Sequence, residues 1–233
     1  MTAALPENML EAKKSAWFER IFAIYNRNLL KRRFHSLNIS GLDFLKAKHE
    51  NFPMLIYANH SSWWDGLVIR KILRRFTFEN YVMMEEKQLR NLFLFRQIGA
   101  FSVVRENPRE AVKSINYAAR LLRENPNRTV LIFPQAEILP NDVRPLNFYR
   151  GLARIIEKVE QCAAVPIALR YEFLGNFKPE IYAKIGEPDF FETNKNFDAK
   201  ELTKKLERRL TATLDDLKRD VRSKTVHDYE RIF

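Results

Sequence analysis

A histidine and an aspartate five residues apart are the strongest candidates for chemistry in this sequence. His60 and Asp65 lie within residues 57–66, directly after a short apolar run. A carboxylate bound to one ring nitrogen fixes the histidine tautomer and stabilises the imidazolium that forms when the other nitrogen takes up a proton. The pair can therefore act as a general base toward a hydroxyl group. Ser61 and Ser62 follow the histidine, but neither lies in the G-x-S-x-G turn of a nucleophilic serine.

The elements around this pair alternate between strands and helices. Strands are predicted at residues 54–58, 81–84, 101–104, 129–133, 164–168 and 182–185, and helices at residues 66–75, 108–124, 151–162 and 198–224. This alternation predicts an α/β fold, a single domain with a mostly parallel central sheet flanked by helices. Ligands of such sheets bind beyond the carboxyl ends of the strands, so His60 is expected at a binding site.

Composition limits the classes of protein to consider. The chain has 233 residues, of which 46% are hydrophobic, enough for one well-packed globular domain. Its single cysteine, Cys162, excludes an intramolecular disulfide and lies in an apolar run typical of a buried side chain. Because no His, Cys and carboxylate cluster has metal-ligand spacing, we expect neither a metal ion nor another bound cofactor.

Basic and aromatic residues are interleaved near the N-terminus. Residues 13–33 carry seven Lys and Arg side chains and one Glu, which accounts for more than half of the net charge of +11. We expect a basic amphipathic helix at residues 8–30, within an N-terminal segment of residues 1–35 that precedes a domain of residues 36–233. Such a helix either lies on a membrane or packs on its own domain. No leader is visible and no apolar run approaches the roughly 18 residues of a spanning helix, so a soluble or peripheral protein is expected.

The residues around His60 resemble the H-x4-D signature of glycerolipid acyltransferases, which acylate lysophosphatidic acid or glycerol 3-phosphate. Further segments match the family's motifs in order along the chain, and together they are more specific than any one motif. They are residues 99–105 (G-x-F-x-V-x-R), 133–138 (the family's F-P-E-G-T-R), 148–151 (F-x-x-G), 165–167 (V-P-I) and 185–188 (I-G-x-P). The resemblance covers about residues 50–190.

The resemblance implies acyl transfer from a thioester, on coenzyme A or acyl carrier protein, to a hydroxyl of a lipid. His60 would be the catalytic base and Asp65 its orienting partner, with no covalent acyl-enzyme. Backbone N–H groups at the start of the following helix would hold the oxyanion. The motifs also assign substrate-binding positions to Gly99, Pro134 and Arg105, the last as a ligand of the substrate phosphate. Membrane lipid would be the partner, met by a cytoplasmic protein bound peripherally to the inner face of a membrane.

One motif departs from the family pattern. Gln135, Ala136, Glu137 and Ile138 stand where the family has Glu, Gly, Thr and Arg. Ile138 cannot bind an anion, Glu137 would repel a phosphate, and Arg144 is a possible replacement six residues on. We therefore expect an acceptor without a phosphate at this position, such as a glycolipid, a lysolipid with another head group or a lipophilic glycoside. Gln135 and Glu137 suit hydrogen bonds to its hydroxyls.

Two other readings remain open from the sequence. One is a non-catalytic basic module that binds a membrane or nucleic acid, although no zinc-finger spacing, RNP-type block or glycine-rich phosphate loop supports nucleic acid. The other is a hydrolase that uses the same pair to cleave a thioester with water. For an acyl chain, Trp63, Trp64 and residues 92–95 are candidates to line an apolar groove, with ordinary core packing as the alternative.

Overall fold

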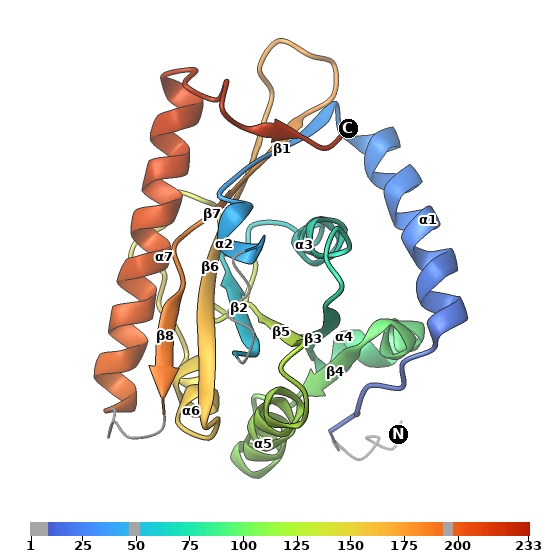
Figure 1. Ribbon diagram of the computed structural model, residues 1–233, viewed down its shortest axis with the longest axis vertical. Coiled ribbons are helices and arrows are strands. Elements are labelled where there is room, and N and C mark those ends of the chain that lie inside the picture. Colours follow the sequence, from blue (N-terminus) through green and yellow to red (C-terminus); the bar gives the residue numbers. More distant parts are fainter. Residues whose placement is uncertain (1–8, 47–51, 193–197) are drawn as a thin grey trace, which may run out of the picture.

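A computed structural model describes residues 9–46, 52–192 and 198–233 as one α/β domain on a nine-stranded sheet (Figure 1). The strands are β1 (Ser36–Ser40), β2 (Met54–Ala58), β3 (Glu79–Glu85), β4 (Ala100–Val103), β5 (Arg128–Ile132), β6 (Gln161–Glu172), β7 (Glu180–Ile185), β8 (Asp189–Glu192) and β9 (Glu230–Arg231). Their order is β4-β3-β5-β2-β6-β7-β1-β9, with β8 also paired to β6. From β4 to β6 all neighbours are parallel, so the predicted α/β class and mostly parallel sheet are confirmed.

Helices cover both faces of the sheet. They are α1 (Ala16–Arg33), α2 (Asp43–Lys46), α3 (Asp65–Leu73), α4 (Glu86–Asn91), the 3-10 helix η1 (Phe93–Ile98), α5 (Pro108–Glu124), α6 (Gly151–Ile156) and α7 (Ala199–Arg222). In Figure 1, α7 lies on one side of the sheet while α1 and α3 lie on the other. The apolar core is correspondingly divided, with α5, α6 and α7 packed on one face and α3 on the opposite one. None of the helices described has the length and apolar composition of a membrane span.

The segment before α1 is extended rather than helical. A helix was predicted from residue 8, but α1 begins at Ala16, and residues 9–15, the N-terminal strap, run beside β4. Ser102 N–H donates to Leu10 O, and Lys13 N–H and Ser15 N–H donate to carbonyls at residues 96–97, each at 2.9 Å. These tertiary bonds occupy the backbone groups that a helix would need.

The predicted helix at residues 151–162 is too long at its C-terminal end. α6 stops at Ile156, and β6 already begins at Gln161. The apolar run that starts at Cys162 pairs with β2 through Ala163 to Ile167 and so becomes a central strand. Strand β1 was not predicted, because its partner β7 lies about 140 residues further along the chain.

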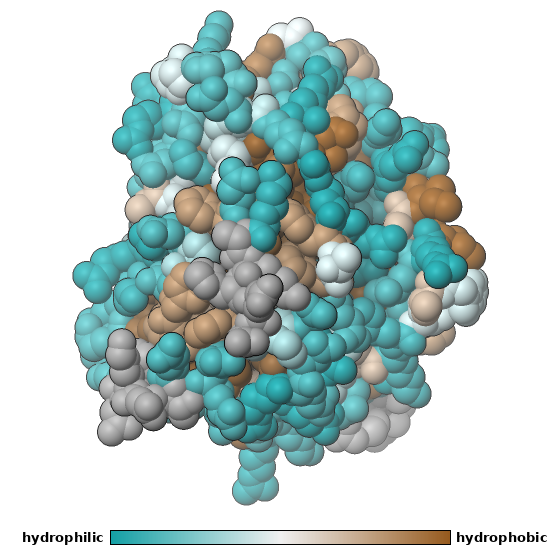
Figure 2. All heavy atoms as spheres, viewed as in Figure 1, coloured by the Kyte–Doolittle hydropathy of each residue, from teal (hydrophilic) through white to brown (hydrophobic). Residues whose placement is uncertain are grey.

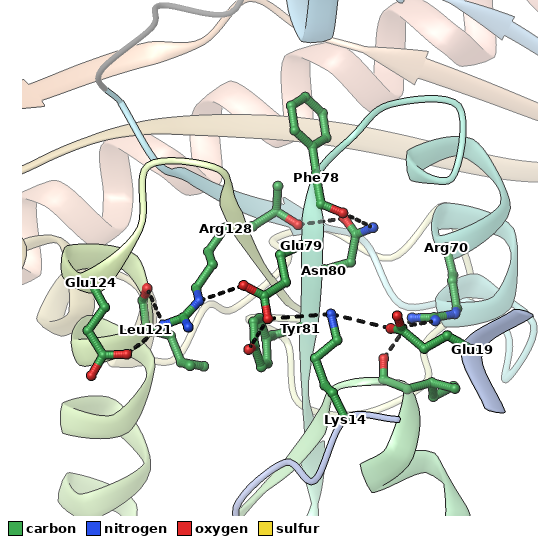
Figure 3. Close-up of polar contacts among 12 residues, drawn as sticks. Lys14, Glu19, Arg70, Phe78, Glu79, Asn80, Tyr81, Leu121, Glu124 and Arg128 are labelled. Carbon is green, nitrogen blue, oxygen red and sulfur yellow. Dashed lines mark hydrogen bonds and ion pairs between the residues drawn. The ribbon is translucent and has the colours of Figure 1, made fainter. Parts of the chain in front are cut away.

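A chain of ionic contacts fastens the strap and α1 to the sheet (Figure 3). Lys14 Nζ lies 3.3 Å from Glu19 Oε1 and 3.7 Å from Glu79 Oε1. Glu79 also pairs with Arg128 at 2.8 Å, and Glu19 with Arg70 of α3 at 3.2 Å. The five residues come from the strap, α1, α3, β3 and β5. Helix α1 is therefore held at a defined position over α3 and η1.

Candidate active site

His60 lies just beyond the carboxyl end of β2, as predicted. Its Nδ1 is 2.9 Å from Asp65 Oδ2, and its ring stacks on Phe133 with centroids 4.3 Å apart. His60 also lines a cavity. Because Nδ1 is bound to the carboxylate, Nε2 is the ring nitrogen that can accept a proton from a ligand there.

Asp65 is the first residue of α3 and is fully buried. Besides His60, its Oδ2 accepts from the backbone N–H groups of Ser61 at 2.7 Å and Ser62 at 2.9 Å. Its Oδ1 accepts from the hydroxyl of Tyr171, on β6, at 2.6 Å. A buried carboxylate is stable only when its oxygens are bonded, and the start of a helix favours negative charge. Four donors therefore fix the carboxylate that orients His60.

Two buried amides hold the backbone around the histidine. Asn59 Oδ1 accepts from Leu169 N–H at 2.8 Å, and Asn59 Nδ2 donates to Leu169 O at 3.0 Å. Gln135 Oε1 accepts from His60 N–H at 2.9 Å. Gln135, predicted to bind substrate hydroxyls, is thus engaged with the site's own backbone and is not among the residues that line the cavity.

The cavity beside His60 has a volume of about 840 Å³ and is lined mainly by apolar side chains. It follows one face of α3 from Gly66 past Leu67 and Arg70 to Leu73, a rise of about 10 Å. Other lining residues come from β3 and η1, such as Val82, Met84, Phe95 and Ile98. Of the predicted groove residues, Trp63, Leu92 and Phe95 line the cavity, whereas Trp64 packs edge-on against Phe34. This space suits a hydrocarbon chain.

One arginine at the cavity is already paired with a carboxylate that also lines it. Arg105 Nη1 donates to Ala136 O at 2.8 Å, and Arg105 Nη2 lies 3.1 Å from Glu85 Oε1. Glu137 and Pro134 also line the cavity. A ligand phosphate at Arg105 would have to compete with the Glu85 carboxylate and would meet a second carboxylate at Glu137.

Besides Gln135, two more predicted substrate-binding residues lie outside the cavity lining. Arg144 donates to Asn141 O and pairs at 2.5 Å with Asp215 of α7, so it does not replace the missing cation at Ile138. Gly99 ends η1 with φ +98°, and a Cβ there would lie 2.3 Å from Asn80 O. Gly99 allows the backbone to pass close to Asn80 O directly after Ile98, and Ile98 does line the cavity.

Tyr171 is the site residue that sequence reasoning missed. It lies 106 residues from Asp65, so no local spacing connects the two. The only signal in the sequence is that Ile167, Leu169 and Tyr171 are two residues apart and so share one face of a strand. This places Tyr171 near Asp65 only when the pairing of β6 with β2 is known. Burial and the neighbouring Asp65 carboxylate raise the pKa of Tyr171 well above its usual value, so its hydroxyl remains a donor to Asp65.

The fold and the cavity define an α/β protein with an apolar cavity beside a His–Asp pair. The family model described as Acyltransferase matches residues 36–170, more than half of the chain, and this protein belongs to the Acyltransferase family. The resemblance to acyltransferases found in the sequence is thus confirmed at the level of the family. No curated protein matches the sequence. Among the residues that the structure describes, no group of three His, Cys, Asp or Glu side chains could hold a metal ion.

Replacing Tyr171 with Phe should destabilise the protein, because it leaves Asp65 Oδ1 unbonded in a buried setting. We expect a loss of about 1–3 kcal/mol in the free energy of unfolding, measured with urea. Tyr182→Phe is the matched control, since its hydroxyl donates to the partly exposed Glu180 carboxylate at the same 2.6 Å. Equal losses in the two variants would contradict the importance assigned to the Asp65 contact.

Replacing Gly99 with Ala should lower the melting temperature more than Gly175→Ala. Both glycines have positive φ values, +98° and +94°, so both variants incur a backbone cost of roughly 1–2 kcal/mol. Only at Gly99 does the added methyl group meet a backbone oxygen, whereas nothing lies within 4 Å at Gly175. Similar shifts in thermal unfolding would show that the crossing at Asn80 adjusts without cost.

Proposed function

We propose that this protein transfers a fatty acyl group from an acyl thioester, on coenzyme A or acyl carrier protein, to a hydroxyl of a lipid acceptor. The observation that carries the proposal is the 2.9 Å contact between His60 Nδ1 and the buried Asp65 carboxylate, beside an apolar cavity. Membership of the Acyltransferase family supports the reaction class. The apolar cavity provides room for the acyl chain next to the base.

In the proposed reaction the acyl group passes from the thioester to the acceptor through a tetrahedral intermediate, without a covalent acyl-enzyme. The acceptor hydroxyl gives its proton to His60 Nε2 while its oxygen bonds to the thioester carbonyl carbon. The carbon–sulfur bond then breaks, and the leaving sulfur takes the proton from His60, which yields an ester and a free thiol. Throughout, Asp65 holds the ring and balances the positive charge of the imidazolium.

The oxyanion of the tetrahedral intermediate needs donors that are not already bonded. The N–H groups of Ser61 and Ser62 are taken by Asp65. Gly66, in the first turn of α3, lines the cavity and has open space on its Cβ side. Asp65 N–H and Val68 N–H already donate to Ser62 O and Trp64 O. We therefore assign the oxyanion to the N–H groups of Gly66 and Leu67, where the helix dipole favours a developing negative charge.

The acceptor in this proposal carries hydroxyls rather than a phosphate at the third motif. Arg105 is occupied by Glu85 and Ala136 O, Glu137 adds a negative charge, and Ile138 is apolar. No predicted replacement cation reaches the cavity, because Arg144 pairs with Asp215. Although Arg150 also lines the cavity, the carboxylates of Glu85 and Glu137 favour a glycolipid, a lysolipid with another head group or a lipophilic glycoside over lysophosphatidic acid.

His60→Ala should lower kcat/KM by about 10²–10⁴-fold while leaving the fold intact. The assay measures thiol release from acyl-coenzyme A or acyl carrier protein, with a mixed polar-lipid extract as acceptor and mass spectrometry of the product. His227→Ala, which removes an exposed histidine near the C-terminus, is the control and should retain full activity. Retained turnover without His60 would overturn the mechanism, and His60-dependent release without any acylated lipid would identify a hydrolase instead.

The wild-type protein should acylate a glycolipid or lipophilic glycoside in preference to lysophosphatidic acid. Ile138→Arg should raise the relative rate with lysophosphatidic acid by about tenfold, because it supplies a cation for the phosphate. Ile138→Gln is the uncharged control and should leave the preference unchanged. Competition between the two acceptors measures the ratio. Efficient use of lysophosphatidic acid by the wild type, with no turnover of sugar-bearing acceptors, would refute the acceptor class but not the reaction.

A further inference from the structure

Helix α1 has apolar side chains on two sides. Phe22, Asn26 and Leu30 are buried against the domain. A second stripe at helical spacing points away from it, consisting of Trp17, Ile21, Ile24 and Tyr25, which are 54–64% exposed. Helix α1 therefore packs on its own domain through one face, while four large apolar side chains on its other face remain outside the core.

A second exposed apolar cluster lies in the turn between β6 and β7. Phe173 is 70% exposed, Leu174 47% and Phe177 99%. Single exposed apolar residues are ordinary, but three in one turn, including two phenylalanines, indicate a surface that is covered by a partner. In Figure 1 this turn projects past the end of the sheet, beyond the C-terminal end of α1.

The turn is fixed to the end of α1. His35 N–H donates to Pro179 O at 2.9 Å, and Lys178 Nζ donates to Lys31 O at 3.4 Å. In Figure 2 apolar atoms appear along the outer edge where α1 runs and again at the projecting turn, with hydrophilic atoms between them. The two clusters are therefore joined through the C-terminal end of α1.

The charge between these clusters is positive. Arg27, Lys31, Arg32 and Arg33 are exposed, and Lys178 joins them from the turn. The sequence has no Asp or Glu from residue 20 to residue 42. Apolar side chains that flank exposed cations match the interface of an anionic bilayer, where rings enter the boundary and Lys and Arg meet the head groups. Nucleic acid would leave the apolar side chains uncovered.

We propose that the outer stripe of α1 and the β6–β7 turn form one docking surface for an anionic lipid bilayer, with two apolar contact points and a basic strip between them. Two separated points define the orientation of the protein on the membrane as well as its attachment. Because α1 packs on η1, whose Phe95 lines the cavity, docking brings the cavity wall close to the lipid. The surface shares no residue with the proposed catalytic pair, so binding is measurable without turnover.

Flotation with phosphatidylglycerol–phosphatidylcholine vesicles tests the proposal at low and high salt. The wild type should float with anionic vesicles, and less so at high salt or with pure phosphatidylcholine. The double variants Phe173→Asp/Phe177→Asp and Trp17→Asp/Ile24→Asp should each lower the partition coefficient by at least about tenfold. Val112→Asp, at an exposed apolar position on α5, is the matched control and should float as the wild type does.

Two results would overturn the proposal. One is a wild type that does not float, and the other is a turn variant that floats as well as the wild type although the control behaves as expected. Unfolding curves of all variants establish that the fold is kept. His60→Ala should float normally, so loss of turnover and loss of binding are separate outcomes. A wild type that floats but has no activity would retain the docking surface and refute the reaction.

Discussion

The buried carboxylate of Asp65 is the constraint on which the site depends. A fully buried anion at the start of a helix requires donors, and its four donors come from the turn after β2, from His60 and from β6. The turn therefore bends around the carboxylate before any substrate is present. His60 is the one donor in this set that also lines the cavity. The hydrogen bond that stabilises the buried carboxylate therefore also positions the base.

Local patterns predicted the parts of the fold that are locally determined. The predicted residues 54–58 and 108–124 coincide with β2 and α5. An apolar run specifies the strand, and a helical spacing that begins with Pro108 specifies the helix, without reference to the rest of the chain. The strap and β1 were missed because their hydrogen-bond partners are distant in sequence. For the same reason the helix at residues 151–162 was extended too far, into a strand that only β2 specifies.

The site was predictable to a similar extent. The five-residue spacing of His60 and Asp65 identified the pair that the structure brings together at 2.9 Å. Side-chain direction in the loop after β5 was beyond the sequence, since Gln135 turns to the backbone of His60 while its neighbour Glu137 lines the cavity. The pairing of Arg105 with Glu85 was equally hidden, yet it determines how much positive charge a ligand would meet.

The strap and the last strand have a consequence for how the chain reaches its folded state. Residues 9–15 cover the β4 edge of the sheet, and β9, together with the bond from Ile232 N–H to Leu37 O, covers the β1 edge. Uncovered strand edges are templates for aggregation. During synthesis the first cover is available before its edge exists, whereas β9 follows β1 by about 190 residues, so the β1 edge stays open until that later segment has been made. A fragment limited to residues 36–170, the segment that the family model matches, would lack the strap, β7 and β9, so it would expose the edges of β4 and β6.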